Sequence, residues 1–190
     1  MKIIDTNIPD VKIIEPDVFG DSRGYFFESW NSGKYASNGI NCNWMQDNES
    51  SSSYGVLRGL HYQAAPYTQA KLVRVIYGKV LDVAVDIRKN SPTFGLYAAV
   101  ELSGENKRQL FVPRGFAHGF AVLSEHAVFA YKCDNTYCPA AERGIAFNDP
   151  ALNIDWQIDI EKALLSAKDL RHPGLADAEL FDFNNQDYLQ

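Results

Sequence analysis

The segment VLDVAVDIR, residues 80–88, constrains the fold more strongly than any other part of the sequence. Alternate positions of this segment carry large apolar side chains: Leu81, Val83, Val85 and Ile87. The positions between them carry smaller or charged residues: Asp82, Ala84, Asp86 and Arg88. A period of two over this length is the pattern of a β-strand with one buried face. We therefore expect a half-buried strand here.

Other short apolar runs surround this strand. The run KLVRVI, residues 71–76, precedes it, and Tyr77-Gly78-Lys79 between the two predicts a hairpin turn. The runs LYAAVEL, RQLFVP, HGFAVLS and AVFAYKC follow, separated by Gly, Pro, Ser and Asn. Many short strands at this spacing indicate an antiparallel sandwich or barrel. Helix is expected only in residues 31–39, closed by Gly39, and in residues 159–168.

Composition excludes several classes of protein. The 190 residues carry a formal net charge of −6 and no block of Lys and Arg, which argues against nucleic acid as a partner. No apolar run reaches the ~18 residues of a membrane span, and MKIIDTNIPDV is too polar for a signal peptide. Cys42, Cys133 and Cys138 have no CxxC spacing and are expected to be free thiols. We expect a cytoplasmic protein with one domain over residues 1–190.

The stretch GVLRGLHYQ, residues 55–63, is the first candidate for chemistry. Gly59 and His61 share one face of a regular strand, so Arg58 faces the other way. If Arg58 and His61 serve one pocket, the strand must bulge or twist, and Gly59 is the natural place for it. A core histidine bonded to a backbone carbonyl is the alternative interpretation of His61, and the residue alone does not decide between them.

Further candidates lie on the later runs. Lys71 is the first residue of KLVRV. The alternative interpretation is a lysine at a sheet edge that only discourages aggregation. His118 lies near the start of a strand in VPRGFAHGFAVLS. Tyr131 and Tyr137 follow it, and both could simply pack in the core or at a rim with a bonded hydroxyl.

A metal site is not expected. Barrels of the jelly-roll type often bind a metal through a His-x-His pair, a nearby Glu and a later His. Here Tyr62 and Gln63 follow His61, and no acid occurs in the next six residues. His61 and His118 alone are too few for a closed site or for the usual three ligands of a catalytic one. A two-histidine site completed by distant carboxylates stays open.

Without a metal, the same residues suit proton transfer. Histidine titrates near neutral pH and can act as a base. Tyrosine can return a proton from the opposite side, and lysine can stabilise an oxyanion. Asp169, in LLSAKDLR, is a candidate partner for the far ring nitrogen of His61. Its distance in sequence leaves that pairing open.

Seven long motifs carry a resemblance to a known family: VFGDSRGYFFESW, QDNESSSSYGVLRGLHYQ, KLVRVIYGKVLDVAVDIRKNSPTFG, NKRQLFVPRGFAHGF, YKCDNTY, NDPALNIDW and LSAKD. With these motifs the chain resembles the dTDP-4-dehydrorhamnose 3,5-epimerases over most of its length. The resemblance implies an all-β fold, a cupin-type antiparallel jelly-roll barrel with a few short peripheral helices. It also implies a homodimer that uses no metal and no organic cofactor.

The resemblance also implies roles for individual residues. His61 takes the place of the proton-abstracting base and Asp169 that of its acidic partner. Tyr131 matches the proton donor, and Lys71 matches the lysine beside the enolate oxygen. Tyr137 matches a tyrosine that stacks on the thymine ring. The positions that match contacts to the nucleotide sugar, besides Lys71, are Arg23, Glu28, Gln46, Asp47, Asn48, Arg58, His118, Glu142 and Lys168. Arg23 is expected to reach the site of the partner subunit.

Two departures from the family pattern are visible. Phe147 stands before NDP where the family tends to have Trp, and Gln157 follows Trp156 where Pro is common. Neither belongs to the catalytic set, so they bear on local loop packing only.

The implied reaction is epimerisation at C3 and C5 of dTDP-4-dehydro-6-deoxy-D-glucose, in dTDP-L-rhamnose biosynthesis. One alternative is a relative that inverts a single carbon or acts on another 4-keto-6-deoxy sugar nucleotide. The others are a metal-dependent cupin such as a dioxygenase, or a sugar-binding cupin without activity. The missing His-x-His motif argues against the dioxygenase, and the complete proton-transfer set argues against a purely binding role.

Overall fold

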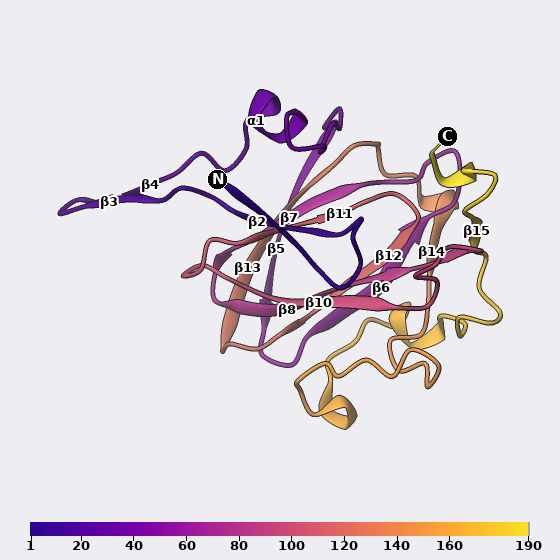
Figure 1. Cartoon of the computed structure of the whole chain (residues 1–190). Coiled ribbons are helices and arrows are strands. Elements are labelled where there is room, and N and C mark those ends of the chain that lie inside the picture. Colours follow the sequence, from indigo (N-terminus) through magenta and orange to yellow (C-terminus); the bar gives the residue numbers. More distant parts are fainter. Residues whose placement is uncertain (190) are drawn as a thin grey trace.

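Two antiparallel sheets face each other in the computed structural model, which describes residues 1–189 (Figure 1). The first sheet has six strands, in the order β1 (Lys2–Asp5), β2 (Lys12–Glu15), β11 (Gln109–Val112), β7 (Lys71–Tyr77), β13 (His126–Cys133) and β5 (Gln46–Ser53). The second has five strands, in the order β10 (Tyr97–Ser103), β8 (Lys79–Asp86), β12 (Phe116–Val122), β6 (Leu57–Gln63) and β14 (Glu142–Gly144). The expected all-β, antiparallel jelly-roll barrel is confirmed.

The main core lies between the two sheets. Val73 and Phe129 from the six-stranded sheet and Ala84 and Phe120 from the five-stranded sheet belong to one buried cluster. The rings of Phe120 and Phe129 stack across the interior with centroids 4.2 Å apart. Stacking of this kind adds about 0.5–1.5 kcal/mol to the burial of the two rings. The contact closes the interior beside the candidate site.

The turn at Gly78 is confirmed, but the hairpin expected there is wrong. β7 pairs with β11 and β13, whereas β8 pairs with β10 and β12, so the chain crosses from one sheet to the other at this turn. Gly78 has φ +77°, and a Cβ there would lie 2.0 Å from the carbonyl oxygen of His126. A turn signal in a sequence predicts where the chain reverses. It does not predict which sheet the next strand joins.

The expectation that β8 is half-buried is also wrong. Asp82 and Asp86 are both 0% exposed, on the face of β8 that the alternation assigned to solvent. That face points into the barrel, while Leu81 and Val83 pack on the other side against Ile145 and other residues that follow β14. The strand is buried on both faces because the C-terminal segment covers the five-stranded sheet from outside.

Short elements surround the barrel. The helix expected after Trp30 is present as α1 (Ser32–Ala36), capped by Asn31, and Gly39 follows it with φ +83°. The helix expected over residues 159–168 is wrong: only a 3₁₀ turn, η2 (Ile160–Lys162), forms there. Leu164 instead makes an isolated bridge with Val56 at the entry to β6, so tertiary pairing outweighs helix propensity.

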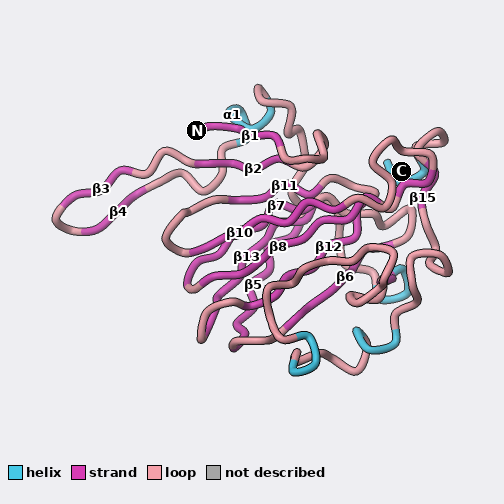
Figure 2. Tube along the Cα trace, turned by 60° about the horizontal axis from the view of Figure 1, so that its bottom comes forward, coloured by secondary structure: helices cyan, strands magenta, loops and turns pink. Residues whose placement is uncertain are grey.

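A two-stranded ribbon, β3 (Phe19–Asp21) and β4 (Gly24–Phe26), projects from the barrel in both views (Figures 1 and 2). The remaining elements are β9 (Arg88–Lys89) paired in parallel with β15 (Phe181–Asp182), and the 3₁₀ turns η1 (Pro139–Ala141), η3 (Asp169–Arg171) and η4 (Asp187–Leu189). Across residues 1–189, no helix has the length and apolar character needed to cross a membrane.

Candidate active site

A bulge in β6 brings Arg58 and His61 onto the same side of the strand. His61 pairs with His118 and Arg58 pairs with Phe120, so three steps along β6 oppose two steps along β12. The extra residue lies at Gly59, whose φ is +136° and whose added Cβ would lie 2.5 Å from the Cα of Gly119. Only glycine fits this close approach without strain. The bulge expected from the sequence is therefore confirmed.

Both side chains line a cavity of about 610 Å³ inside the barrel. The five-stranded sheet contributes Arg58, His61 and His118 to its wall. The six-stranded sheet contributes Lys71 and Tyr131. The segment after β14 adds Ser166, Lys168 and Asp169 at one side. His61 and Tyr131 thus enter one cavity from opposite sheets.

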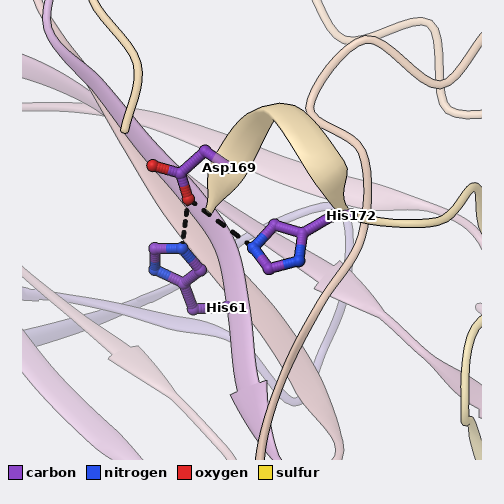
Figure 3. Close-up of side chains that lie close together, drawn as sticks. All are labelled: His61, Asp169 and His172. Atoms are coloured by element: carbon purple, nitrogen blue, oxygen red, sulfur yellow. Dashed lines mark hydrogen bonds and ion pairs between the residues drawn. The ribbon is translucent and has the colours of Figure 1, made fainter. Parts of the chain in front are cut away.

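His61 is paired with Asp169, as Figure 3 shows. The distance from His61 Nε2 to Asp169 Oδ1 is 2.5 Å, and the Asp169 side chain is 3% exposed. The Ser166 hydroxyl donates to Asp169 Oδ2 over 2.7 Å. Burial alone would raise the pKa of Asp169, but the hydrogen bonds from His61 and Ser166 outweigh it and lower that pKa to about 2. Asp169 is therefore a carboxylate at neutral pH.

This pairing determines which nitrogen of His61 can act as a base. A carboxylate can only accept a hydrogen bond, so the proton of a neutral His61 ring lies on Nε2. Nδ1 then carries the free lone pair. An Asp that holds a histidine in one tautomer and stabilises its protonated form is the usual way to orient a base of this kind.

A third group, His172, lies beside this pair (Figure 3). Its Nε2 atom is 3.6 Å from Asp169 Oδ1. Its ring meets that of His61 edge-on, with centroids 5.5 Å apart. A Cβ at Gly144 would lie 2.4 Å from His172 Nε2, so glycine is needed there. His172 was not among the residues predicted from the sequence, because it reaches Asp169 through the 3₁₀ turn η3, which only the structure shows.

A second histidine–aspartate pair contributes His118 to the wall of the cavity. His118 Nε2 is 3.0 Å and 3.1 Å from the two carboxylate oxygens of Asp82. Burial lowers the pKa of His118. Asp82 was not predicted as a site residue because the alternation in β8 placed it on the solvent face.

Lys71 and Tyr131 form the opposite wall. They lie on the neighbouring strands β7 and β13, on the face that also carries Val73 and Phe129 of the core. Burial lowers the pKa of Lys71 and raises the pKa of Tyr131. The phenol therefore keeps its proton at neutral pH and can donate it.

Polar residues from four segments of the chain form the mouth of the cavity. The Tyr137 hydroxyl and the Lys168 ammonium both donate to Glu142 Oε2, over 2.7 Å and 2.6 Å. Gln46 accepts from the backbone N–H of Tyr137 over 3.0 Å and donates to Asn48 over 2.8 Å. A smaller hollow of about 120 Å³ contains Gln46, Asn48 and Tyr137 and shares His61 and Glu142 with the main cavity.

Three residues expected at the site line neither the main cavity nor this smaller hollow. The side chain of Arg23 is 88% exposed and pairs with Asp21 on the projecting ribbon β3–β4. Glu28 binds Lys34 at helix α1. Asp47 binds Lys132 over 2.9 Å and lines a neighbouring hollow, which Asn48 and Tyr131 also line.

A histidine–carboxylate base facing a phenol and a lysine across one cavity defines an acid–base enzyme. It can move protons on a bound small molecule that carries a carbonyl group. The polar groups at the mouth of the cavity can form hydrogen bonds with the rest of such a molecule.

Comparisons with known proteins identify the family. Residues 5–177 match the family model described as dTDP-4-dehydrorhamnose 3,5-epimerase. The chain is 54% identical to the dTDP-4-dehydrorhamnose 3,5-epimerase of Shigella flexneri over 95% of this chain and 99% of that protein. The chain therefore belongs to the dTDP-4-dehydrorhamnose 3,5-epimerase family, which is a family of isomerases.

Two solved structures are also similar. The dTDP-6-deoxy-D-glucose-3,5-epimerase of Legionella pneumophila, in complex with dTDP-4-keto-L-rhamnose, is 51% identical with a TM-score of 0.92, and the match covers 96% of this chain and 98% of that one. ChmJ of Streptomyces bikiniensis, a 3′-monoepimerase in complex with dTDP-quinovose, is 34% identical with a TM-score of 0.84, and the match covers 90% and 87%.

Proposed function

We propose that this chain inverts C3 and C5 of dTDP-4-dehydro-6-deoxy-D-glucose and forms dTDP-4-dehydro-L-rhamnose, a step of dTDP-L-rhamnose biosynthesis. The observation that carries the proposal is the entry of His61 and Tyr131 into one cavity from opposite sheets. Inversion of a carbon needs a base on one face and an acid on the other. The sugar nucleotide bound to the Legionella relative is the product of this reaction.

The reaction follows from the acidity of protons next to a ketone. C3 and C5 both flank the carbonyl at C4, so loss of either proton gives an enolate with its charge on O4. His61 Nδ1 takes the proton, and the Asp169 carboxylate stabilises the imidazolium that results. Lys71 stabilises O4, and Tyr131 returns a proton to the opposite face. General acid–base catalysis of this kind is worth on the order of 10² to 10⁴ in rate. No step needs a metal or an organic cofactor.

The rest of the proposed site binds the dTDP group. Arg58, which also donates to Ser52 Oγ over 3.1 Å, has a fork of donors that matches diphosphate oxygens. Tyr137 is 51% exposed at the mouth, where its ring is free to stack on thymine. The remaining proposed contacts to the nucleotide sugar are Gln46, Asn48, His118, Glu142 and Lys168. Arg23, Glu28 and Asp47, which lie outside the cavity of their own chain, are also proposed to contact it.

We also propose that the protein is a homodimer. Phe19 and Phe26 pair on the ribbon β3–β4 and are 66% and 67% exposed. A projecting ribbon with apolar side chains needs another surface to cover it. A second copy of the chain would cover it and would bring Arg23 to the cavity of the partner.

We further propose a cytoplasmic protein, with residues 1–190 as one domain.

Inversion at one carbon only, at C3 or at C5, is the second candidate. It is supported by the similarity to ChmJ, a 3′-monoepimerase, because the same base and acid would serve either reaction.

Incubation with dTDP-4-dehydro-6-deoxy-D-glucose in heavy water, followed by NMR, tests both candidates. Because each abstracted proton is replaced from solvent, a double epimerase leaves deuterium at C3 and C5 of an inverted product. Label and inversion at one carbon alone would replace the proposal with the second candidate. Absence of label at both carbons would overturn both.

A further inference from the structure

We propose that His61, Asp169 and His172 form a binding site for a divalent transition metal such as Zn²⁺, and that the bound ion switches the base off. Each residue offers one ligand atom, and the three atoms all lie within 4.8 Å of one another. The site shares His61 and Asp169 with the proposed base, although the proposed reaction itself needs no metal. The binding does not depend on the proposed function; only its effect on the rate does.

The geometry is close to that of a bound zinc ion. Zinc takes histidine nitrogens at about 2.0–2.1 Å and carboxylate oxygens at about 2.0–2.2 Å, so two ligands of a tetrahedral ion lie roughly 3.3 Å apart. Asp169 Oδ1 and His172 Nε2 are already 3.6 Å apart. The 2.5 Å contact between His61 and Asp169 has to open, and the ligand atoms of His61 and His172 lie within 4.8 Å of each other. A turn of the His61 ring provides that change.

His172 gives an independent indication of a ligand. Its Nε2 atom is buried and, among the described residues, has no hydrogen-bond partner. Buried polar atoms without a partner are uncommon and costly. Figure 3 shows this nitrogen directed at Asp169. The hydrogen bond from Ser166 holds Oδ2, which leaves Oδ1 for the metal and orients the carboxylate for it.

The ligand set selects the class of metal. Two imidazoles and one carboxylate suit Zn²⁺, Ni²⁺ or Cu²⁺, whereas Mg²⁺ and Ca²⁺ prefer sites made of oxygen ligands. We therefore expect Zn²⁺ to bind and Mg²⁺ to leave the site empty.

A metal at this site removes the base without blocking the cavity. When Nε2 of a neutral His61 binds the ion, the single ring proton must move to Nδ1, so Nδ1 has no lone pair to accept a proton from the sugar. His172 is not among the residues that line the cavity. The ion would therefore lie on the side of His61 that faces His172. Because substrate could still enter the cavity, zinc should lower kcat with little change in KM.

Calorimetric titration of ZnCl₂ into metal-free protein tests the binding. The variants are His172→Phe, which keeps an aromatic ring of similar size, and His126→Phe as the control. His126 bonds to Ser51 at the surface, so its loss removes a histidine without touching the site. We expect one zinc ion per chain in the wild type and in His126→Phe, and an affinity reduced more than about 10-fold in His172→Phe. Equal affinity in all three proteins would overturn the site.

A second readout covers the case in which His172→Phe does not fold. Nitrogen NMR of the wild-type protein labelled at histidine should show zinc shifting the Nε2 resonances of both His61 and His172. A shift of only one of them would overturn the three-residue site.

The effect on rate is measured separately. We expect zinc to lower the wild-type kcat, a chelator to restore it, and Mg²⁺ to have no effect. A rise in KM with unchanged kcat would overturn the inhibitory mechanism, because it places the metal in the cavity. If the chain shows no epimerase activity, the proposed function fails, while the titration still decides on the metal site.

Discussion

At the scale of the residue, the proposed chemistry depends on one nitrogen of His61. Asp169 is buried and ionised, and it fixes the ring proton on Nε2. The lone pair that reacts is therefore on Nδ1. The pairing joins residues 108 positions apart in the sequence. It orients the ring and leaves Nδ1 as the nitrogen that can act as a base.

Replacement of His61 tests this assignment. We expect His61→Asn to lose deuterium incorporation at C3 and at C5 together, by about 10² to 10⁴ in rate, because one base serves both carbons. His126→Asn is the matched control and should exchange at the wild-type rate. Exchange at the wild-type rate in His61→Asn would remove His61 from the role of base.

Some of the site residues could be predicted from the sequence, and others could not. If Arg58 and His61 serve one pocket, the local pattern predicts a bulge or twist at Gly59, and the structure shows the bulge. Asp82 and His172 could not be predicted in the same way. Their roles depend on which strands and turns pack together, and periodicity within one segment carries no information about its distant neighbours.

At the scale of the element, the bulge in β6 positions the site. Gly59 combines φ +136° with an approach to Gly119 that leaves no room for a side chain. The strand signals in the sequence predicted an antiparallel barrel correctly. They failed where long-range pairing decides, at the crossing between β7 and β8 and at residues 159–168.

A Gly59→Ala variant should show what the bulge contributes. A methyl group there adds a clash and backbone strain, each of order 1–3 kcal/mol, and it displaces His61. We expect a lower free energy of unfolding in denaturant and a loss of epimerase activity. Gly39→Ala is the control, because Gly39 also has positive φ but nothing lies within 4 Å of its added Cβ. If the two variants lose equal stability and both keep full activity, the close approach at Gly59 has no role in the site.

The buried ion pair at the end of β8 gives a prediction about pH. Burial alone would raise the pKa of Asp86, but hydrogen bonds from Arg88, Ser91 and Thr93 outweigh it and lower that pKa below 3.8. The unfolded chain therefore binds the proton more readily than the folded one. The stabilisation from Asp86 is complete above about pH 4 and is lost as the pH falls through the folded pKa.

An Asp86→Asn variant is expected to lose about 3–5 kcal/mol at neutral pH, because it leaves Arg88 buried without its main partner. Its unfolding free energy should also depend less on pH between about 2 and 4 than that of the wild type. Denaturant titrations at several pH values provide the comparison. Parallel pH curves for the two proteins would show that Asp86 does not contribute to acid unfolding.

At the scale of the whole molecule, the exposed ribbon predicts association. Phe26→Glu places a charge in a surface that the proposed dimer buries, so sedimentation equilibrium should show monomers. Tyr77→Glu is the control, since Tyr77 is 64% exposed at the turn between β7 and β8 rather than on the ribbon. A wild-type protein that is monomeric, or a Phe26→Glu variant that remains dimeric, would contradict the proposed interface.

The barrel as a whole has one consequence for the reaction: its two sheets present a base and an acid to opposite faces of one bound ring. NMR of the Tyr131→Phe variant with dTDP-4-dehydro-6-deoxy-D-glucose in heavy water tests this most directly. His61 can still remove and return a proton on its own face. We therefore predict deuterium in the recovered substrate at C3 or C5, with inverted product reduced by about 10² to 10⁴ in rate. Inverted product at the wild-type rate would contradict the account.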